Sequence, residues 1–209
     1  MRRTIHGLAV AAVVTLAGGA GSAGDKKDGP KADPPGTPLE LVLTGKTVKY
    51  TLDTGGLAPE EYKKKVEGMV AADRLPPTAK VDLKVEVKNT SDKPVTVWAK
   101  GDPVVLELEL KGKGALNVKP RLAFTREFRS PSAVEIGPGK TLDIPVKALV
   151  SGFRGASKYS LWTLPGEYEL VATLKTGVKP APEGAKKGMD GFGVVTLTSA
   201  PLELTVEKK

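Results

Sequence analysis

The chain of 209 residues contains no cysteine and a single histidine, His6. Without cysteine it can form neither disulfides nor cysteine-ligated zinc sites, and it has no nucleophilic thiol. It also has no N-terminal cysteine to carry a lipid. Because His6 lies in a stretch that we expect to be removed, the mature chain would have no imidazole for general-base catalysis or metal ligation.

The common motifs of catalysis and nucleotide binding are absent as well. There is no nucleophile elbow, phosphate-binding loop or dinucleotide-binding glycine pattern. Residues 188–193 carry one carboxylate, Asp190, which is too few for a calcium loop. Glu107 and Glu109 could pair as in a glycosidase, but carboxylates on an outer strand face more simply keep a protein soluble. We therefore expect a protein that is not an enzyme and that uses no cofactor or metal.

The first 23 residues have the three-part pattern of a secretory signal peptide. Arg2 and Arg3 precede an apolar run over residues 8–17, which is too short to span a bilayer, and small residues lead up to an expected cleavage after Ala23. The two arginines leave twin-arginine export open beside the general secretory route. We therefore expect an exported protein, either periplasmic or extracellular.

The rest of the chain divides into a linker and one domain. Residues 24–38 are rich in Asp, Lys, Gly and Pro and have no large apolar side chain, which predicts a flexible linker. Residues 39–208 can form the core of a single domain, and none of their segments is long and apolar enough to span a membrane. Loss of two arginines lowers the 32 basic residues to 30, so the net charge against 24 acidic residues falls from +8 to +6. This modest excess is typical of a solvated surface, and we expect no nucleic-acid partner.

Alternating apolar and polar residues predict many short strands. The clearest runs from Pro165 to Leu174, where a Pro-Gly turn is followed by apolar residues at every second position. Residues 80–88 alternate as strictly, which predicts one buried and one solvated face. Pro145 cannot donate to a ladder and places its strand at an edge. Residues 39–52, interrupted by a glycine, are predicted to form a hairpin.

One helix is expected among these strands, over residues 59–72. Tyr62, Val66, Met69 and Val70 share its apolar face, and Pro59 suits its first position. Gly68 costs it about 1 kcal/mol relative to alanine. We therefore expect the helix to depend on packing over a sheet edge or an open end of the sheets.

Together these elements predict a mainly β fold, an antiparallel immunoglobulin-like β-sandwich with one short N-terminal amphipathic helix. Its landmarks are Asn89-Thr90-Ser91 at a strand end, Pro138-Gly139 before an edge strand and Pro165-Gly166-Glu167-Tyr168 at a late strand. In their order, residues 81–174 resemble small bacterial immunoglobulin-like or fibronectin-type-III-like modules and, more distantly, the bacterial intracellular proteinase inhibitor family. The resemblance implies the fold and not inhibition, because no inhibitory loop can be aligned. It makes Tyr168 either a corner tyrosine bonded to the backbone or an ordinary core tyrosine.

Two segments, residues 151–164 and 176–191, are predicted to be long loops. Five of the ten aromatic residues lie between Phe124 and Trp162, interleaved with arginines. Because aromatic and arginine side chains are the usual anchors of interfaces, we predict a binding face at one end of the sandwich. The predicted binding face consists of Arg121, Arg126, Arg129, Phe153, Arg154, Tyr159 and Trp162. The alternative is that the aromatic rings close the core.

The function expected from these patterns is that of an exported, non-catalytic module. It would bind a polymer or protein of the cell envelope through its end loops, and arginines would favour an acidic partner that offers carboxylate or sulfate groups. A purely structural or accessory envelope domain is one alternative. A proteinase-inhibitor-like protein is the other.

Overall fold

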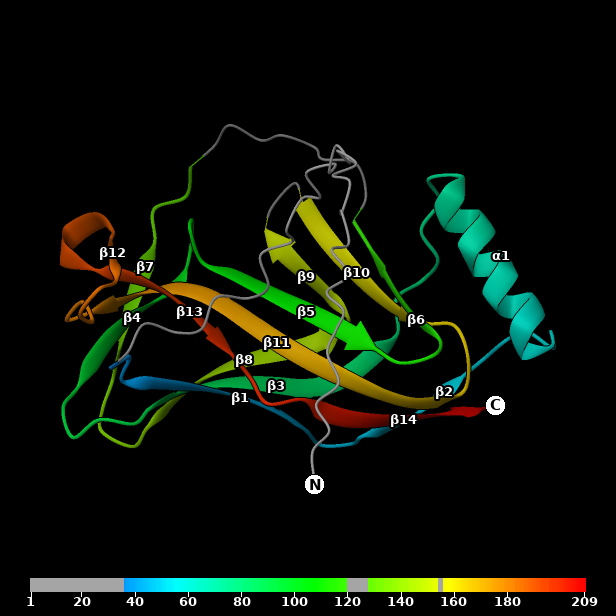
Figure 1. Cartoon of the computed structure of the whole chain (residues 1–209), viewed down its shortest axis with the longest axis horizontal. Helices are drawn as coiled ribbons and strands as arrows, with labels where there is room; N and C mark the ends of the chain where they lie inside the picture. Colours follow the sequence, from blue (N-terminus) through cyan, green and yellow to red (C-terminus); the bar gives the residue numbers. More distant parts are fainter. Residues whose placement is uncertain (1–35, 120–127, 154–155) are drawn as a thin grey trace, which may run out of the picture.

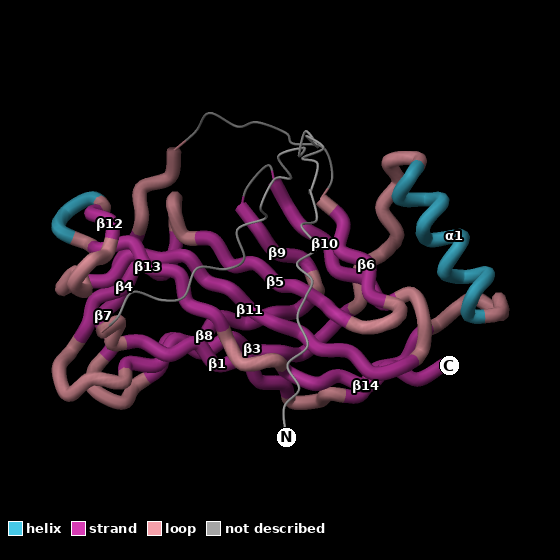
Figure 2. Tube along the Cα trace, viewed as in Figure 1, coloured by secondary structure: helices cyan, strands magenta, loops and turns pink. Residues whose placement is uncertain are grey.

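The computed structural model describes residues 36–119, 128–153 and 156–209. The expected signal peptide and nearly all of the expected linker lie outside these ranges, as do Arg121, Arg126 and Arg154. Strands make up most of the described chain, and the two helical segments lie at opposite ends of the molecule (Figure 2). The fold is mainly β, as the sequence predicts.

The smaller sheet has three antiparallel strands in the order β1–β3–β8. These are β1 (Leu39–Gly45), β3 (Lys80–Asn89) and β8 (Thr141–Ala148). Pro145 lies in β8, at an edge of the sheet, as predicted. On the solvent face, Lys84 of the central strand contacts both Glu86 (2.6 Å) and Asp143 (3.1 Å). The sheet therefore has the one wet face that alternation predicts.

The larger sheet has eleven strands and is built around β11 (Gly166–Lys179). Its path runs β12–β13–β11–β5–β9–β10–β6, with β2, β4, β7 and β14 attached beside it. Five strands of this path are β12 (Lys186–Lys187), β13 (Gly193–Thr198), β5 (Val105–Lys111), β9 (Val150–Phe153) and β10 (Ala156–Trp162). The others are β6 (Ala115–Val118), β2 (Lys49–Leu52), β4 (Val95–Lys100), β7 (Ser132–Ile136) and β14 (Leu202–Lys208). A short 3-10 helix, η1 (Met189–Gly191), follows β12.

β11 is paired along both edges for most of its length. One edge pairs with β5 from Glu169 to Lys175, and the other pairs first with β14 and then with β13. Its alternate side chains, including Leu170 and Leu174, are buried as predicted. The strand also continues beyond the predicted end, so the expected loop over residues 176–191 is wrong in its first part. The reason is packing: Thr176 is buried and donates a hydrogen bond to the backbone oxygen of Trp98 (2.7 Å).

The two sheets face each other around one apolar core (Figure 1). Leu83 of β3 and Leu170 of β11 are 2% and 0% exposed, so both cleanest alternating patterns point into the core from opposite sheets. The predicted helix is present as α1 (Pro59–Ala71) and stands at the end of the molecule near β2, β6 and the C-terminus (Figure 1). Of the helices in the described residues, none has the length and hydropathy of a membrane span.

The predicted hairpin over residues 39–52 is wrong. β1 pairs with β3 in the smaller sheet, whereas β2 pairs in parallel with β14 in the larger one. Leu52 is buried in the core and Tyr50 packs against it, so the chain crosses between the sheets instead of turning back. The β2–β14 pair also departs from the fully antiparallel arrangement that the sequence predicts.

The expected loop over residues 151–164 is also wrong, because most of it forms the antiparallel strands β9 and β10. This hairpin, together with β6, which pairs with β10, bonds to the edge of β5 largely through side chains. Ser151 Oγ accepts the Leu108 N–H (2.9 Å), while Asn117 accepts the Leu110 N–H (3.2 Å) and donates to the Leu110 oxygen (2.8 Å). Ser160 donates to the same Asn117 side chain (2.7 Å). These polar residues interrupt the alternation expected of a strand. Their side chains nevertheless bond to the backbone groups at the edge of β5, as the backbone of a neighbouring strand would.

The Asn89 landmark joins the two sheets. Its side-chain amide donates to the backbone oxygens of Lys93 (2.7 Å) and Ile136 (2.9 Å), while its oxygen accepts the Ser91 N–H (2.9 Å). Asn89 is fully buried, so its amide is occupied inside the protein. The turn that the sequence predicts here therefore also ties the end of β3 to the end of β7.

Tyr168 makes the backbone bond of a corner tyrosine. Its hydroxyl donates to the backbone oxygen of Leu164 (2.5 Å), four residues upstream, and its ring is buried. Burial raises the pKa of Tyr168, and the bond to Leu164 partly opposes this rise. Of the two roles left open by the sequence, the corner role is confirmed.

Leu170→Ala should lower the free energy of unfolding by about 2–5 kcal/mol, because it empties a site between β11 and the facing sheet. Glu169→Ala, one residue away on the exposed face, should change it by less than about 0.5 kcal/mol. Urea unfolding of both variants measures the difference. Equal losses would mean that the strand has the opposite register.

Tyr168→Phe should cost about 1–3 kcal/mol, because it leaves the Leu164 oxygen without its partner while keeping the ring. Tyr159→Phe is the matched control, since the Tyr159 hydroxyl makes no hydrogen bond in the described residues and Tyr159 is half-buried. Thermal melts at several denaturant concentrations compare them. A Tyr168 variant as stable as the control would show that the corner bond contributes nothing.

Candidate ligand-binding cleft

The boundaries of α1 follow from local chemistry. Pro59 occupies its first turn, and the Glu61 carboxylate accepts the Ala58 N–H (3.3 Å). At the other end Asp73 adopts a positive φ of 59°, the Arg74 N–H bonds to the Met69 oxygen (2.8 Å) and the Asp73 N–H to the Val70 oxygen (3.0 Å). These are the two bonds of a Schellman motif. Both ends of the helix are therefore set by its own sequence.

A glycine turn sets the position of α1 beside β2. Gly55 and Gly56 have φ values of 61° and 84°, which other residues rarely adopt. Asp53 Oδ1 accepts the Gly55 N–H (2.9 Å), and the Thr54 hydroxyl donates to the Leu57 oxygen (2.8 Å). The turn thus leads directly from the end of β2 into the helix and fixes Asp53 at the junction.

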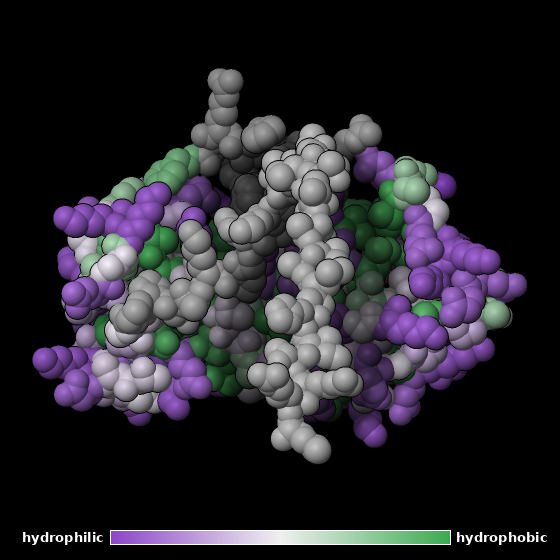
Figure 3. All heavy atoms as spheres, viewed as in Figure 1, coloured by the Kyte–Doolittle hydropathy of each residue, from purple (hydrophilic) through white to green (hydrophobic). Residues whose placement is uncertain are grey.

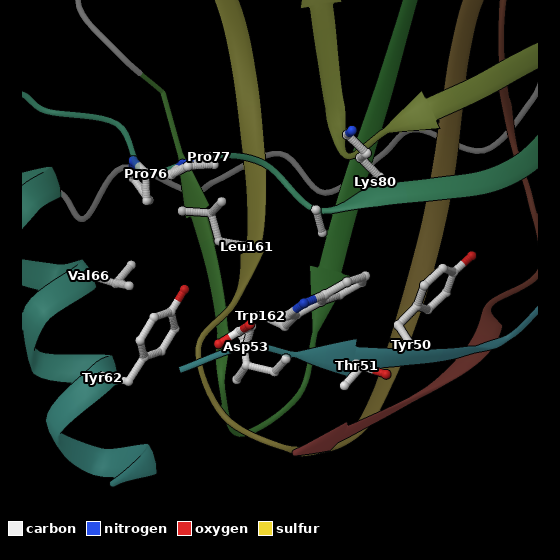
Figure 4. Close-up of a pocket in the computed structure, with 12 residues that line it drawn as sticks. Tyr50, Thr51, Asp53, Tyr62, Val66, Pro76, Pro77, Lys80, Leu161 and Trp162 are labelled. Carbon is white, nitrogen blue, oxygen red and sulfur yellow. The ribbon is translucent and has the colours of Figure 1, made fainter. Parts of the chain in front are cut away.

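Between α1 and the end of the larger sheet lies a cleft of about 430 Å³, which we call the helix cleft (Figure 4). Val66, the only buried residue of α1, and half-buried Tyr62 line it from the helix, and Leu161 and Trp162 from β10. Its remaining lining residues are Tyr50, Thr51, Leu52, Asp53, Pro76, Pro77, Ala79 and Lys80. In Figure 3 the outer side of α1 is hydrophilic, while hydrophobic surface appears on the side toward the sheet. The volume lies in the range of small-ligand sites.

Trp162 forms part of the core as well as the cleft. Its ring stacks on Tyr50, with centroids 5.1 Å apart, and it is 6% exposed. Its indole N–H donates no hydrogen bond in the described residues, where every fully buried side-chain nitrogen or oxygen has a partner. The N–H must therefore keep some access to solvent. Trp162 thus presents a polar edge, and not a free ring face, to a ligand.

Charge in the helix cleft centres on Asp53. Lys209 donates to Asp53 Oδ2 (2.7 Å), and this bond, followed by the Gly55 N–H, lowers the pKa of Asp53. Burial and then the Asp53 charge raise the pKa of Tyr62. Near neutral pH the cleft therefore holds an ionised carboxylate and a protonated tyrosine. The Tyr62 hydroxyl makes no hydrogen bond in the described part of the chain, so it is free to donate one to a ligand.

The structure does not bring all of the described members of the predicted binding face into one site. Phe153 ends β9 and pairs with Ala156 at the start of β10, whereas Trp162 ends β10. Six residues of strand separate the two ends of β10, about 20 Å at 3.3 Å per residue. Arg129, whose backbone N–H and oxygen bond to Asp102, lines a different pocket together with Gly152, the residue before Phe153. Of the members that the structure describes, only Trp162 lines the helix cleft.

Sequence reasoning missed Tyr50, Asp53 and Tyr62 as site residues. Tyr62 was assigned to the apolar face of the helix, which is correct, but the helical periodicity alone does not indicate which strand that face approaches. Tyr50 was placed in a hairpin that does not form. The available signal was the Gly55-Gly56 turn after β2, since a short turn keeps a helix beside the strand that precedes it.

Comparison of the chain with protein-family models and with curated proteins gave no match. Among the described residues no three His, Cys, Asp or Glu side chains are grouped so that they could hold a metal ion. The helix cleft combines apolar walls with a few hydrogen-bonding groups and a single carboxylate. Such a lining suits binding and orienting a ligand.

Lys209→Ala should raise the pKa of Asp53 toward its ordinary value, because it removes the largest cause of the lowering. Because the folded pKa is below the unfolded one, the contribution of Asp53 to stability is present above its ordinary pKa and is lost as pH falls through the folded value. NMR titration of side-chain carboxyls measures this. Lys208→Ala is the control, and an unchanged Asp53 titration in Lys209→Ala would contradict the pairing.

Proposed function

We propose that this protein is an exported, non-catalytic β-sandwich module of immunoglobulin-like type that binds a cell-envelope polymer or protein in the helix cleft. The observation that carries the proposal is the position of α1. The helix contributes one buried residue, Val66, and stands at the end of the sandwich, yet its Tyr62 and Val66 line a cleft of about 430 Å³. A helix with so small a share in the core is better explained by the cleft that it encloses.

Each part of the proposal has separate support. The pattern of residues 1–23 favours export. The lack of cysteine, and of any histidine beyond His6, favours a non-catalytic role. The corner bond of Tyr168 and the facing sheets favour an immunoglobulin-like relationship, although β2 and β14 pair in parallel.

The alternative of a purely structural domain is favoured by one observation, the burial of Trp162. A ring that is 6% exposed and stacked on Tyr50 closes the core whether or not a ligand binds. The two roles differ at Tyr62, which lies on the helix side and only half-buried. In a structural domain only the ring of Tyr62 would contribute, whereas a ligand could also bond to its hydroxyl.

Tyr62→Ala should weaken binding of the mature protein to envelope particles of its source organism by about tenfold or more, because it removes a ring from the cleft wall. Lys64→Ala, on the exposed side of the same helix, should bind as the unchanged protein does. Co-sedimentation at increasing protein concentration gives both affinities, with circular dichroism to check folding. Absence of binding by the unchanged protein, or equal binding by all three, would leave the structural alternative.

A further inference from the structure

We propose that the ligand of the helix cleft is an uncharged saccharide unit of an envelope glycan. This inference rests on the proposed function and specifies its ligand. Three polar groups that line the cleft make no hydrogen bond in the described ranges: the hydroxyls of Thr51 and Tyr62 and the indole N–H of Trp162. They are set among apolar surfaces, with the Asp53 carboxylate beside them.

A sugar ring matches this combination of groups. Its C–H faces are apolar and can pack against Val66, Leu161 and the ring of Tyr62. Its hydroxyls both donate and accept, so they can pair with the indole N–H, with side-chain hydroxyls and with the remaining lone pairs of Asp53. Buried polar groups of a ligand need such partners, because an unpaired one costs binding free energy. A purely apolar ligand would instead leave these groups of the protein unpaired.

An extended peptide is less suitable, although β2 lies at an edge of the larger sheet. Peptides that add to a sheet edge need free backbone groups along that edge. Here the Thr47 hydroxyl already bonds to the Lys49 oxygen (3.1 Å) and accepts the Lys49 N–H (3.2 Å). Along this edge of β2 only the backbone groups of Thr51 are left for a peptide. Recognition of a ligand in the cleft must therefore depend on side chains.

An acidic ligand is also unfavourable in the helix cleft. Asp53 is ionised, because Lys209 and the Gly55 N–H lower its pKa, and it holds Lys209 in an ion pair (2.7 Å). A carboxylate or sulfate would have to displace Asp53 from that lysine. Lys80 is the one basic residue among those that line the cleft, and its side chain points away from Asp53 (Figure 4). The acidic preference predicted from the arginines therefore does not extend to this site.

A competition experiment tests the class of ligand. Envelope particles are digested exhaustively with protease and separated into a protein-free glycan fraction and a peptide fraction. Each fraction is then added to the mature protein bound to intact particles. The glycan fraction should lower the amount of protein bound to the particles at least tenfold, and the peptide fraction should leave that amount unchanged. Release by the peptide fraction, alone or together with the glycan, or by neither, would overturn the saccharide, while binding to the particles themselves would still support the proposed function.

Matched tyrosine variants locate the site. Tyr62→Phe removes one hydrogen bond and keeps the ring, so affinity for the glycan fraction should fall roughly three- to tenfold. Tyr159→Phe makes the same change outside the cleft and should leave the affinity unchanged. Isothermal titration of the glycan fraction measures both. A loss in Tyr159→Phe without a loss in Tyr62→Phe would overturn the cleft and favour the face predicted from the sequence.

Discussion

The pairing of β11 along both edges is the constraint on which the other elements depend. β5 occupies one edge, and β14 and β13 divide the other, so the central strand has neighbours for nearly its full length. Its inward side chains, such as Leu170, meet the β3 side of the core and bury both sheets at once. Tyr168 closes the start of the strand onto Leu164. Because Leu164 lies two residues after the end of β10, this bond also holds the chain where β10 ends.

The helix cleft is a consequence of that arrangement. β10 pairs with β9 and β6, and a bond between Ser160 and Asn117 joins it to β6 as well. Its end places Leu161 and Trp162 in the cleft with residues of β2. α1 covers this end without filling it, since Val66 is its one buried residue. The helix therefore completes the burial of the sheet end and leaves space beside Trp162. The chemistry of that space follows from residues whose main roles are structural.

Much of the fold could be predicted from the sequence where one periodicity dominates. β3, the first part of β11 and α1 follow their patterns, because one face of each packs on the core. β2 and β10 could not be predicted, for two physical reasons. β2 pairs with β14, far away in sequence. β10 pairs with β9 and β6, and the polar side chains that join these strands to β5 interrupt the alternation. Since the cleft lies where these two strands meet α1, Trp162 was the only lining residue that sequence reasoning selected as a site residue.

The most direct test of a ligand in the helix cleft uses the two tryptophans, because each gives its own indole N–H signal in an NMR spectrum. Trp162 lines the cleft, whereas Trp98 stacks on Phe192 (4.8 Å) among β4 and η1 at the opposite end of the molecule (Figure 1). Addition of the envelope glycan fraction to nitrogen-15-labelled protein should shift the Trp162 signal and leave the Trp98 signal in place. A bound complex in which Trp98 shifts alone, or neither signal moves, would contradict binding in the cleft.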